Sequence, residues 1–390
     1  MRSDLTNEVK KRAGSRVMPV LSGFFIMGFV DLAGIAASYV KRDFGLNDTQ
    51  ANLIPMLAFL WFILLSVPTG MLMGRIGRKN TALLSLLLTF VAILLPLVFY
   101  NFTTILLGFA VMGMGNTMMQ VSFNPLLANV VPGKRLTGFL TFGQFTRSIA
   151  SFLGPLIAGT VVSFWGDWKL TFYIYMAVTA GAVVWLFLAS IPREPVPEER
   201  ITWKGTFALL RERQVMALFL GILFFVGIDV GLNTTIPRFL MERTDLPLEE
   251  AGLGTSLYFA ARVAGSVAGG FLLLRYSSVK FLRWMMCLAT LGFITLLGVN
   301  EFWTLLVLIF LLGLSCANIF SILLGIGIER YSGHTNEVTA IILMGVAGGA
   351  LSTPLMGMVA DQAGQTAGMA VLLPCLVYLL ILSFSLKRNW

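Results

Sequence analysis

Four ionisable residues stand near the middle of long apolar segments of this chain. They are Asp31, Arg147, Asp229 and Arg262. A charged side chain at the centre of a bilayer costs about 2.5–3.5 kcal/mol on insertion scales, so four unpaired charges would cost roughly 10–14 kcal/mol. We therefore expect these side chains to face water, a solute or each other. Two acids and two bases can form two ion pairs.

Two interpretations of these charges remain open. In the first, they form a pair of structural salt bridges. In the second, one bond alternates: ionised Asp31 holds Arg147, and protonation of Asp31 or the arrival of a polar solute loosens the pair. Burial and a neighbouring cation act on a carboxylate in opposite directions, so the residue types do not choose between the two.

Four amide side chains at similar depth predict a polar cavity. Gln120 and Asn124 are spaced i, i+4, Gln144 precedes Arg147 by three residues, and Asn318 stands in a later segment. Such spacing places side chains on one helix face. A site for a small polar solute needs several donors and acceptors, here with an aromatic platform, so we expect these amides to bind substrate, although such amides also hydrogen-bond neighbouring helices. The candidate platforms are Trp61, Phe145, Tyr258, Phe259 and Phe320.

The sequence has no arrangement typical of covalent catalysis or metal binding. The three cysteines, Cys287, Cys316 and Cys375, lie inside apolar segments, and the single histidine, His334, lies in a polar loop. A zinc site needs about four nitrogen or sulfur ligands, and the chain lacks a G-x-x-x-x-G-K-[ST] phosphate loop. We expect no enzymatic activity, no catalytic residues, no metal and no cofactor, with a proton or sodium ion as coupling ion.

The composition predicts the elements that position these residues. The 390 residues are 57% hydrophobic and 12% charged, whereas soluble domains are about 25% charged. A membrane helix needs about 20 apolar residues. We therefore expect an all-α polytopic membrane protein with twelve transmembrane helices. The apolar runs lie at residues 17–40, 51–74, 80–99, 102–129, 138–164, 170–190, 214–240, 250–274, 281–300, 302–328, 337–361 and 366–386.

The distribution of Lys and Arg predicts the orientation. Of 28 such residues, 21 lie in the termini and in the loops after even-numbered spans, five lie on the opposite side, and Arg147 and Arg262 lie inside helices. Cytoplasmic loops collect Lys and Arg, so both termini are expected in the cytoplasm, which requires an even number of spans. The same rule explains the net charge of +9 without a nucleic-acid partner.

An internal repeat of about 200 residues predicts two halves. Gly70 recurs as Gly270, and Asp31 recurs as Asp229 at an offset of 198. Two parallel six-helix repeats are typical of the major facilitator fold, in which the substrate site lies between the halves near the midplane. We expect residues 1–190 to form the N-terminal bundle, 191–213 a cytoplasmic linker and 214–390 the C-terminal bundle. Within the linker, Trp203, Phe207 and Leu210 recur at helical spacing, which favours an amphipathic helix over a plain connection.

The stretch GMLMGRIGRK (70–79) resembles the loop signature G-x-x-x-D-R-x-G-R-K of the major facilitator superfamily, with Gly74 in place of the usual acid. Four further stretches are similar to the fourth, fifth, tenth and eleventh helices of the fucose–galactose–glucose:proton symporter family. They are GMGNTMMQVSFNP (113–125), LTFGQFTRSIASFLGPLIAG (140–159), CANIFSILLGIGIE (316–329) and MGVAGGALSTPLMGMVADQAG (344–364).

This resemblance implies a monomeric, multi-pass transporter of the bacterial cytoplasmic (inner) membrane. It also implies roles for two positions. In the symporter family an acid in the first helix and a glutamate in the fourth helix, four residues before Asn-Pro, serve transport and proton coupling. Asp31 matches the first position, whereas Gln120 occupies the second. Glutamine does not titrate, so coupling would use Asp31, Asp229 or a sodium ion, or there would be no coupling.

The leading hypothesis is a secondary active transporter that takes up a small neutral solute, most simply a monosaccharide, by alternating access with cation coupling. Its partners would be the solute and the lipid bilayer. The alternative is an antiporter that exports amphipathic or drug-like compounds. GPLIAG (154–159) is similar to the antiporter motif of the fifth helix but lacks its final double glycine. The polar midplane favours the first hypothesis.

Overall fold

The computed structural model describes residues 16–131, 136–191, 209–273, 275–331 and 335–386. Its regular elements within these ranges are helices. The first half contains the helical segment Arg16–Phe44, which includes η1 (Gly28–Asp31) and α2 (Leu32–Phe44), followed by α3 (Asp48–Ala51), α4 (Leu53–Ile76), α5 (Arg78–Val98), α6 (Phe102–Val130), α7 (Leu136–Trp165) and α8 (Leu170–Leu188). The second half contains α10 (Arg213–Thr244), α11 (Leu248–Leu273), α12 (Ser278–Gly298), α13 (Phe302–Cys316), α14 (Ile319–Arg330), α15 (Thr335–Met344), η4 (Gly345–Ala347), α16 (Gly348–Ala370) and α17 (Leu373–Ser385).

Eleven helical segments in the described ranges are long and apolar enough to cross a membrane. One of them, Ile341–Ser385, has 45 residues and would be about 67 Å long at 1.5 Å per residue, twice the hydrocarbon core of roughly 30 Å. Gly364 interrupts it with φ 84° and ψ 170°. This segment therefore contains two spans, which confirms the all-α fold with twelve spans.

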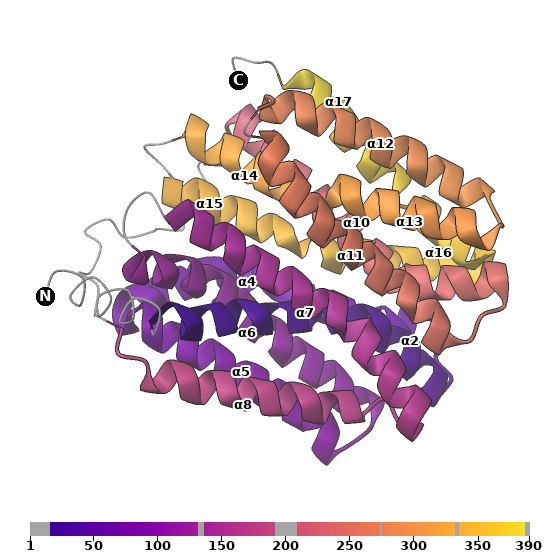
Figure 1. Ribbon diagram of the computed structural model, residues 1–390, viewed down its shortest axis with the longest axis horizontal. Coiled ribbons are helices and arrows are strands. Elements are labelled where there is room, and N and C mark those ends of the chain that lie inside the picture. Colours follow the sequence, from indigo (N-terminus) through magenta and orange to yellow (C-terminus); the bar gives the residue numbers. More distant parts are fainter. Residues whose placement is uncertain (1–15, 132–135, 192–208, 274, 332–334, 387–390) are drawn as a thin grey trace, which may run out of the picture.

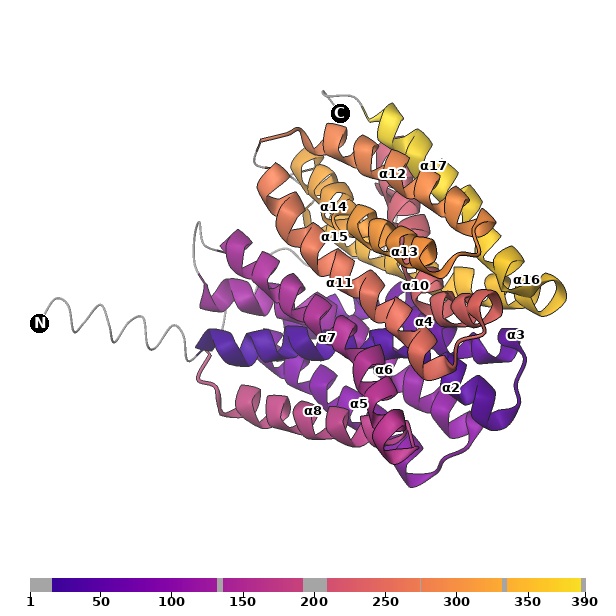
Figure 2. The same ribbon diagram turned by 45° about the vertical axis from the view of Figure 1, so that its right-hand side comes forward.

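The halves lie side by side, as the indigo-to-magenta and orange-to-yellow parts of Figure 1 show. Between them, α7 packs along α11, α4 along α16, and α2 against α10. Helices α2, α3 and α16 meet at one end of the molecule (Figure 2), which we call the α3 end. The opposite end is called the α15 end. Most of the predicted linker 191–213, including Trp203 and Phe207, lies outside the described residues, so the division of the chain at that segment stays a prediction.

The internal repeat is visible in the backbone of the loops. Gly45, with φ 62°, ends α2, and Asp245, with φ 52°, ends α10 at an offset of 200. Gly166, with φ 74°, separates α7 from α8, and Gly364 separates the last two spans. Left-handed φ values favour glycine. These matching interruptions fix where the corresponding helices of the two halves end.

In the first half, one carboxylate joins three loops at the α3 end. Asp43, near the end of α2, accepts hydrogen bonds from the Tyr100 hydroxyl at 2.5 Å and from the Trp168 indole at 2.9 Å. Tyr100 precedes α6, and Trp168 precedes α8. Burial, together with the neighbouring Asp43 carboxylate, raises the pKa of the Tyr100 hydroxyl. The ends of three hairpins are thereby held as one unit.

In the second half, an arginine at the equivalent position joins the corresponding three loops. Arg243, 200 residues after Asp43, donates to the side chains of Asn300 and Thr366, the latter at 2.8 Å. Asn300 follows α12, and Thr366 follows the break at Gly364. The same three loops are therefore joined in both halves, although with different residue types, and each half is braced separately at its α3 end.

Two glycines allow the helices that flank the charged residues to approach closely. A Cβ atom at Gly28 would lie 2.5 Å from the main-chain oxygen of Arg147, and one at Gly348 would collide with the main-chain oxygen of Leu223. The first helix therefore packs directly on α7, and α16 packs directly on α10. This packing brings Asp31 to the depth of Arg147.

Candidate substrate and coupling site

Asp229 and Arg262 form a tight ion pair inside the second half. Arg262 Nη1 lies 2.7 Å from Oδ1 and 2.6 Å from Oδ2 of Asp229. The hydroxyl of Tyr258, one turn before Arg262 on α11, donates to Asp229 Oδ1 at 2.6 Å. Both carboxylate oxygens are therefore engaged, and the charge of the arginine is neutralised by its partner.

Asp31, at the equivalent position of the first half, has weaker partners. Its Oδ2 accepts a hydrogen bond from the Ser151 hydroxyl at 2.5 Å and lies 4.0 Å from Arg147 Nη2. Ser151 and Arg147 are one turn apart on α7. The two aspartates thus occupy repeat-related positions, but an arginine holds only Asp229 at hydrogen-bond distance.

Each ion pair lies within one half of the molecule. Asp31 and Arg147 belong to the first half, and Asp229 and Arg262 belong to the second. The expected pairing of two acids with two bases therefore occurs. Loosening the Asp31–Arg147 pair alone breaks no bond between the halves, so a direct mechanical link from Asp31 to the second half needs a further contact.

A second set of polar side-chain atoms, on α4 and α6, is buried without partners among the described residues. Among the described residues, no hydrogen bond reaches either amide atom of Asn116, the Gln120 Nε2 atom or the Trp61 Nε1 atom. Asn116 is 1% exposed and Gln120 6%. Trp61 lies against α6, since its Cδ1 atom is 2.9 Å from where a Cβ of Gly113 would be. Each unpaired buried polar group costs about 1–3 kcal/mol, so these atoms have hydrogen-bonding capacity that a water molecule or a polar solute would satisfy.

Asn116 was not among the predicted site residues, although its signal is in the sequence. It precedes Gln120 by four residues, as Gln120 precedes Asn124, so the three amides share one face of α6. Asn124 is half-buried and donates to the Gln120 main-chain oxygen at 3.0 Å. The amide face extends one turn further along α6 than the sequence analysis proposed.

The two other predicted amides lie in different surroundings. Gln144 is exposed on α7. Asn318 is buried at the break between α13 and α14, and its Nδ2 atom donates to the main-chain oxygen of Gly265 at 2.8 Å. Gly269 leaves room for this amide. Asn318 therefore makes the contact between helices that was the alternative to substrate binding.

A buried polar network joins the halves at the α3 end. Asp48, 4% exposed, is bonded to Arg238 of α10, accepts from Gln365 Nε2 at 2.7 Å, and lies 2.8 Å from Lys41 Nζ. Arg238 Nη2 also donates to Asn52 Oδ1 at 2.7 Å. Arg238 and Gln365 come from the second half, whereas Asp48 and Asn52 come from the first.

Asp361 completes this network from α16. Its carboxylate accepts from the main-chain nitrogens of Asp48 at 2.6 Å and Thr49 at 2.9 Å, at the first turn of α3. Asn52 Nδ2 donates to the Thr353 main-chain oxygen at 2.7 Å. We call this set the α3 network; its residues are Asp48, Thr49, Asn52, Arg238, Thr353, Asp361 and Gln365. Residue spacing does not predict this set, because Asp48 and Arg238 are 190 residues apart in the chain.

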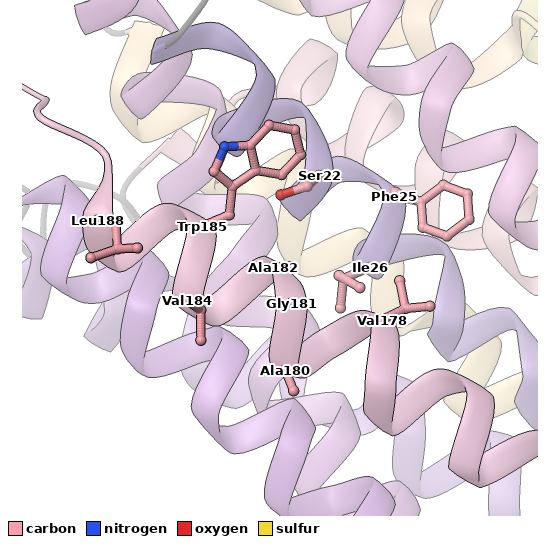
Figure 3. Close-up of a pocket in the computed structure, with 10 residues that line it drawn as sticks. All are labelled: Ser22, Phe25, Ile26, Val178, Ala180, Gly181, Ala182, Val184, Trp185 and Leu188. Atoms are coloured by element: carbon pink, nitrogen blue, oxygen red, sulfur yellow. The ribbon is translucent and has the colours of Figure 1, made fainter.

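A separate groove on the outside of the first half is apolar. It has a volume of about 790 Å³ and lies between the first helix and α8 (Figure 3). Its walls include Phe25, Ile26 and Trp185, and the hydroxyl of Ser22 is already bonded to the main-chain oxygen of Pro19 at 2.7 Å. It contains none of the unpaired polar atoms, so it suits a lipid chain and not a sugar.

Comparison with known families agrees with this architecture. The family model of the Major Facilitator Superfamily matches residues 20–253, more than half of the chain. The chain belongs to this superfamily. The protein is therefore a multi-pass membrane transporter and not an enzyme.

Individual relatives within the superfamily differ in their solutes. A glucose/galactose transporter of Brucella abortus is 25% identical over 382 residues, covering 93% of this chain and 91% of the relative. A nitrite extrusion protein of Bacillus subtilis is 23% identical over 343 residues, covering 85% and 83%. A solved structure of the Escherichia coli fucose:proton symporter, 17% identical, superimposes with a TM-score of 0.71 and covers 95% of this chain and 98% of that chain.

Proposed function

We propose that this transporter carries a monosaccharide by cation-coupled alternating access. The observation that carries the proposal is the set of unpaired, buried polar atoms on Trp61, Asn116 and Gln120. Amides both donate and accept hydrogen bonds, as sugar hydroxyls do. The four mid-membrane charges sum to zero as two pairs, which favours a neutral solute. The names of the Brucella and Escherichia coli relatives support the same class.

The geometry of the two aspartates supports Asp31 as the coupling acid. Both oxygens of Asp229 are occupied by Arg262 and Tyr258, so a proton arriving there must displace a tight ion pair. Asp31 holds a serine hydroxyl and an arginine 4.0 Å away. We infer that Asp31 exchanges a cation during transport and that Asp229 with Arg262 is a structural pair.

The α3 network is the contact that must open for access from that end. The arginine and lysine distribution favours a cytoplasmic location for the α15 end and for both termini, and the bacterial relatives favour an inner membrane. The network would then close the outer side. At the α15 end, Gly74 replaces the signature acid, and a Cβ atom at this position would meet no atom within 4 Å. Closure at that end therefore has to use other residues.

Transport of an inorganic anion is the second candidate. The feature that favours it is Arg147, whose carboxylate partner is 4.0 Å away, and the nitrite extrusion relative supports it. Binding a small anion requires an arginine whose charge is free for charge-assisted bonds. Both mid-membrane arginines face an aspartate, which favours the neutral solute. Export of amphipathic compounds fits less well with the buried amide face of α6.

A binding screen on the purified protein tests the proposal. Thermal-shift and calorimetric titrations would compare glucose, galactose and fucose with nitrate, nitrite and an amphipathic dye. We expect a monosaccharide to bind and Asn116→Ala to weaken its binding about tenfold, because a hydroxyl loses its partner. Asn80→Ala is the matched control, since the Asn80 amide donates to the Ile76 main-chain oxygen of its own helix. Binding of nitrate or dye with no response to any sugar would contradict the proposal.

A further inference from the structure

One side chain connects the coupling aspartate of the first half directly to the second half. Asn233, on α10, donates from Nδ2 to the main-chain oxygen of Asp31 at 2.9 Å. Asn233 is 2% exposed. Both mid-membrane ion pairs lie within single halves. The bond from Asn233 therefore provides a direct contact between Asp31 and the second half.

The bond reaches the first helix where its geometry changes. Asp31 is the last residue of η1, and the α-helical segment resumes at Leu32. A short 3₁₀ stretch inside a helix often marks a hinge. One turn later, a Cβ atom at Gly34 would lie 2.6 Å from Asn233 Cγ. The first helix is therefore fitted closely around the Asn233 side chain, and a rotation of η1 would move the Asp31 carbonyl relative to it.

Helix α10 also contains the two charged sites of the second half. Asp229 and Asn233 are spaced i, i+4 and share a helix face. Arg238 follows Asp229 by nine residues, about 13 Å along the helix axis, and belongs to the α3 network. The Thr255 hydroxyl donates to the Asn233 main-chain oxygen at 3.4 Å, which ties this turn of α10 to α11. The turn of α10 that contains Asn233 therefore moves together with the rest of the second half.

The Asn233 side chain forms its bond to Asp31 through the Nδ2 donor. Its Oδ1 atom is buried and has no partner within the described ranges. A leucine of similar shape would avoid that unpaired acceptor, which costs free energy in an apolar environment. The cost of the amide is thus offset only by the bond from Nδ2 to Asp31.

We propose that Asn233 is a positioning residue that makes closure of the α3 network depend on the state of Asp31. The proposal rests on the proposed function, in which Asp31 exchanges the coupling cation. While Ser151 and Arg147 hold the Asp31 carboxylate, the Asp31 carbonyl faces Asn233 and the closed arrangement at the α3 end is favoured. When a proton or solute replaces these partners, η1 rotates, the bond from Asn233 is lost, and the α3 end opens more readily.

Spin-label distances in the full-length protein test the link. Labels at Thr103 and Trp303, exposed residues 200 apart at the starts of α6 and α13, report the separation of the halves at the α3 end. Asn233→Leu should raise the population with the longer distance about fivefold, the effect of losing one net hydrogen bond. Asn233→Ala is the second variant, in case leucine impairs folding. Thr234→Val is the matched control, because that hydroxyl bonds within α10, to Val230, and its distances should equal those of the wild type.

Combining Asn233→Leu with Asp31→Asn separates a positioning role from a packing role. If Asn233 acts through the state of Asp31, the double variant should give the distances of Asp31→Asn alone. Unchanged distances in both Asn233 variants, or an effect of Asn233→Leu that persists in full beside Asp31→Asn, would overturn the proposal. If the wild type binds no sugar, the distance measurement still decides the link, and only the proposed function fails.

Discussion

At the scale of single residues, two aspartates at repeat-related positions have acquired different surroundings. Both carboxylate oxygens of Asp229 accept hydrogen bonds, from Arg262 and Tyr258. Asp31 instead has one close partner, Ser151, and an arginine at 4.0 Å. The sequence identified both aspartates and both arginines, because charges inside apolar runs are rare. It could not rank them, because distances of 2.6 and 4.0 Å depend on helix packing and not on spacing along the chain.

Substituting the two aspartates separately tests this difference. Asp229→Asn leaves the partly buried Arg262 without its carboxylate partner, so it should lower stability by about 1–3 kcal/mol. This is seen as a lower Tm and a poor yield. Asp31→Asn should change Tm much less but abolish gradient-driven accumulation while sparing solute exchange. Tryptophan fluorescence during heating and paired accumulation and exchange assays check both. Full accumulation by Asp31→Asn, or equal stability of the two variants, would refute the assignment.

At the scale of helices, apolar runs predicted where the spans lie, and the repeat predicted how they correspond. The break of the tenth span at Asn318 and the 3₁₀ turn before Leu32 were not predicted, because neither position has a helix-breaking proline. The α3 network was missed for another reason. Asp48 and Arg238 are 190 residues apart, and no periodicity within a helix indicates which polar residues of the two halves will meet.

The cap that Asp361 places on α3 gives a prediction at this scale. Asp361→Ala removes the acceptor of two main-chain N–H groups and should destabilise closure at the α3 end. A cysteine introduced at Thr353, which is fully buried there, should then react with a hydrophilic maleimide about tenfold faster, in a background lacking the native cysteines. Asp167→Ala is the control, because that carboxylate bonds within its own loop, to Lys169. Equal labelling rates in the two variants would show that the cap does not hold the end closed.

At the scale of the whole molecule, the chain consists of two halves, each braced at its α3 end by its own polar cluster. Asp43 with Tyr100 and Trp168 braces the first half, and Arg243 with Asn300 and Thr366 braces the second. Such bracing favours movement of the halves as two bodies about the α7–α11 and α4–α16 contacts. The composition predicted the membrane bundle, and the distribution of Lys and Arg predicted the even span count, whereas the polar contacts between halves required the structure.

Uptake by proteoliposomes tests the central claim most directly. Purified protein would be reconstituted into vesicles, and labelled glucose, galactose and fucose would be supplied with an imposed proton gradient, with a sodium gradient, or with neither. We predict saturable accumulation of at least one of these sugars above its external concentration under one gradient, and collapse of that accumulation when an ionophore dissipates the gradient. Saturable uptake of none of these sugars, alongside gradient-driven movement of nitrite or of a dye, would contradict the account.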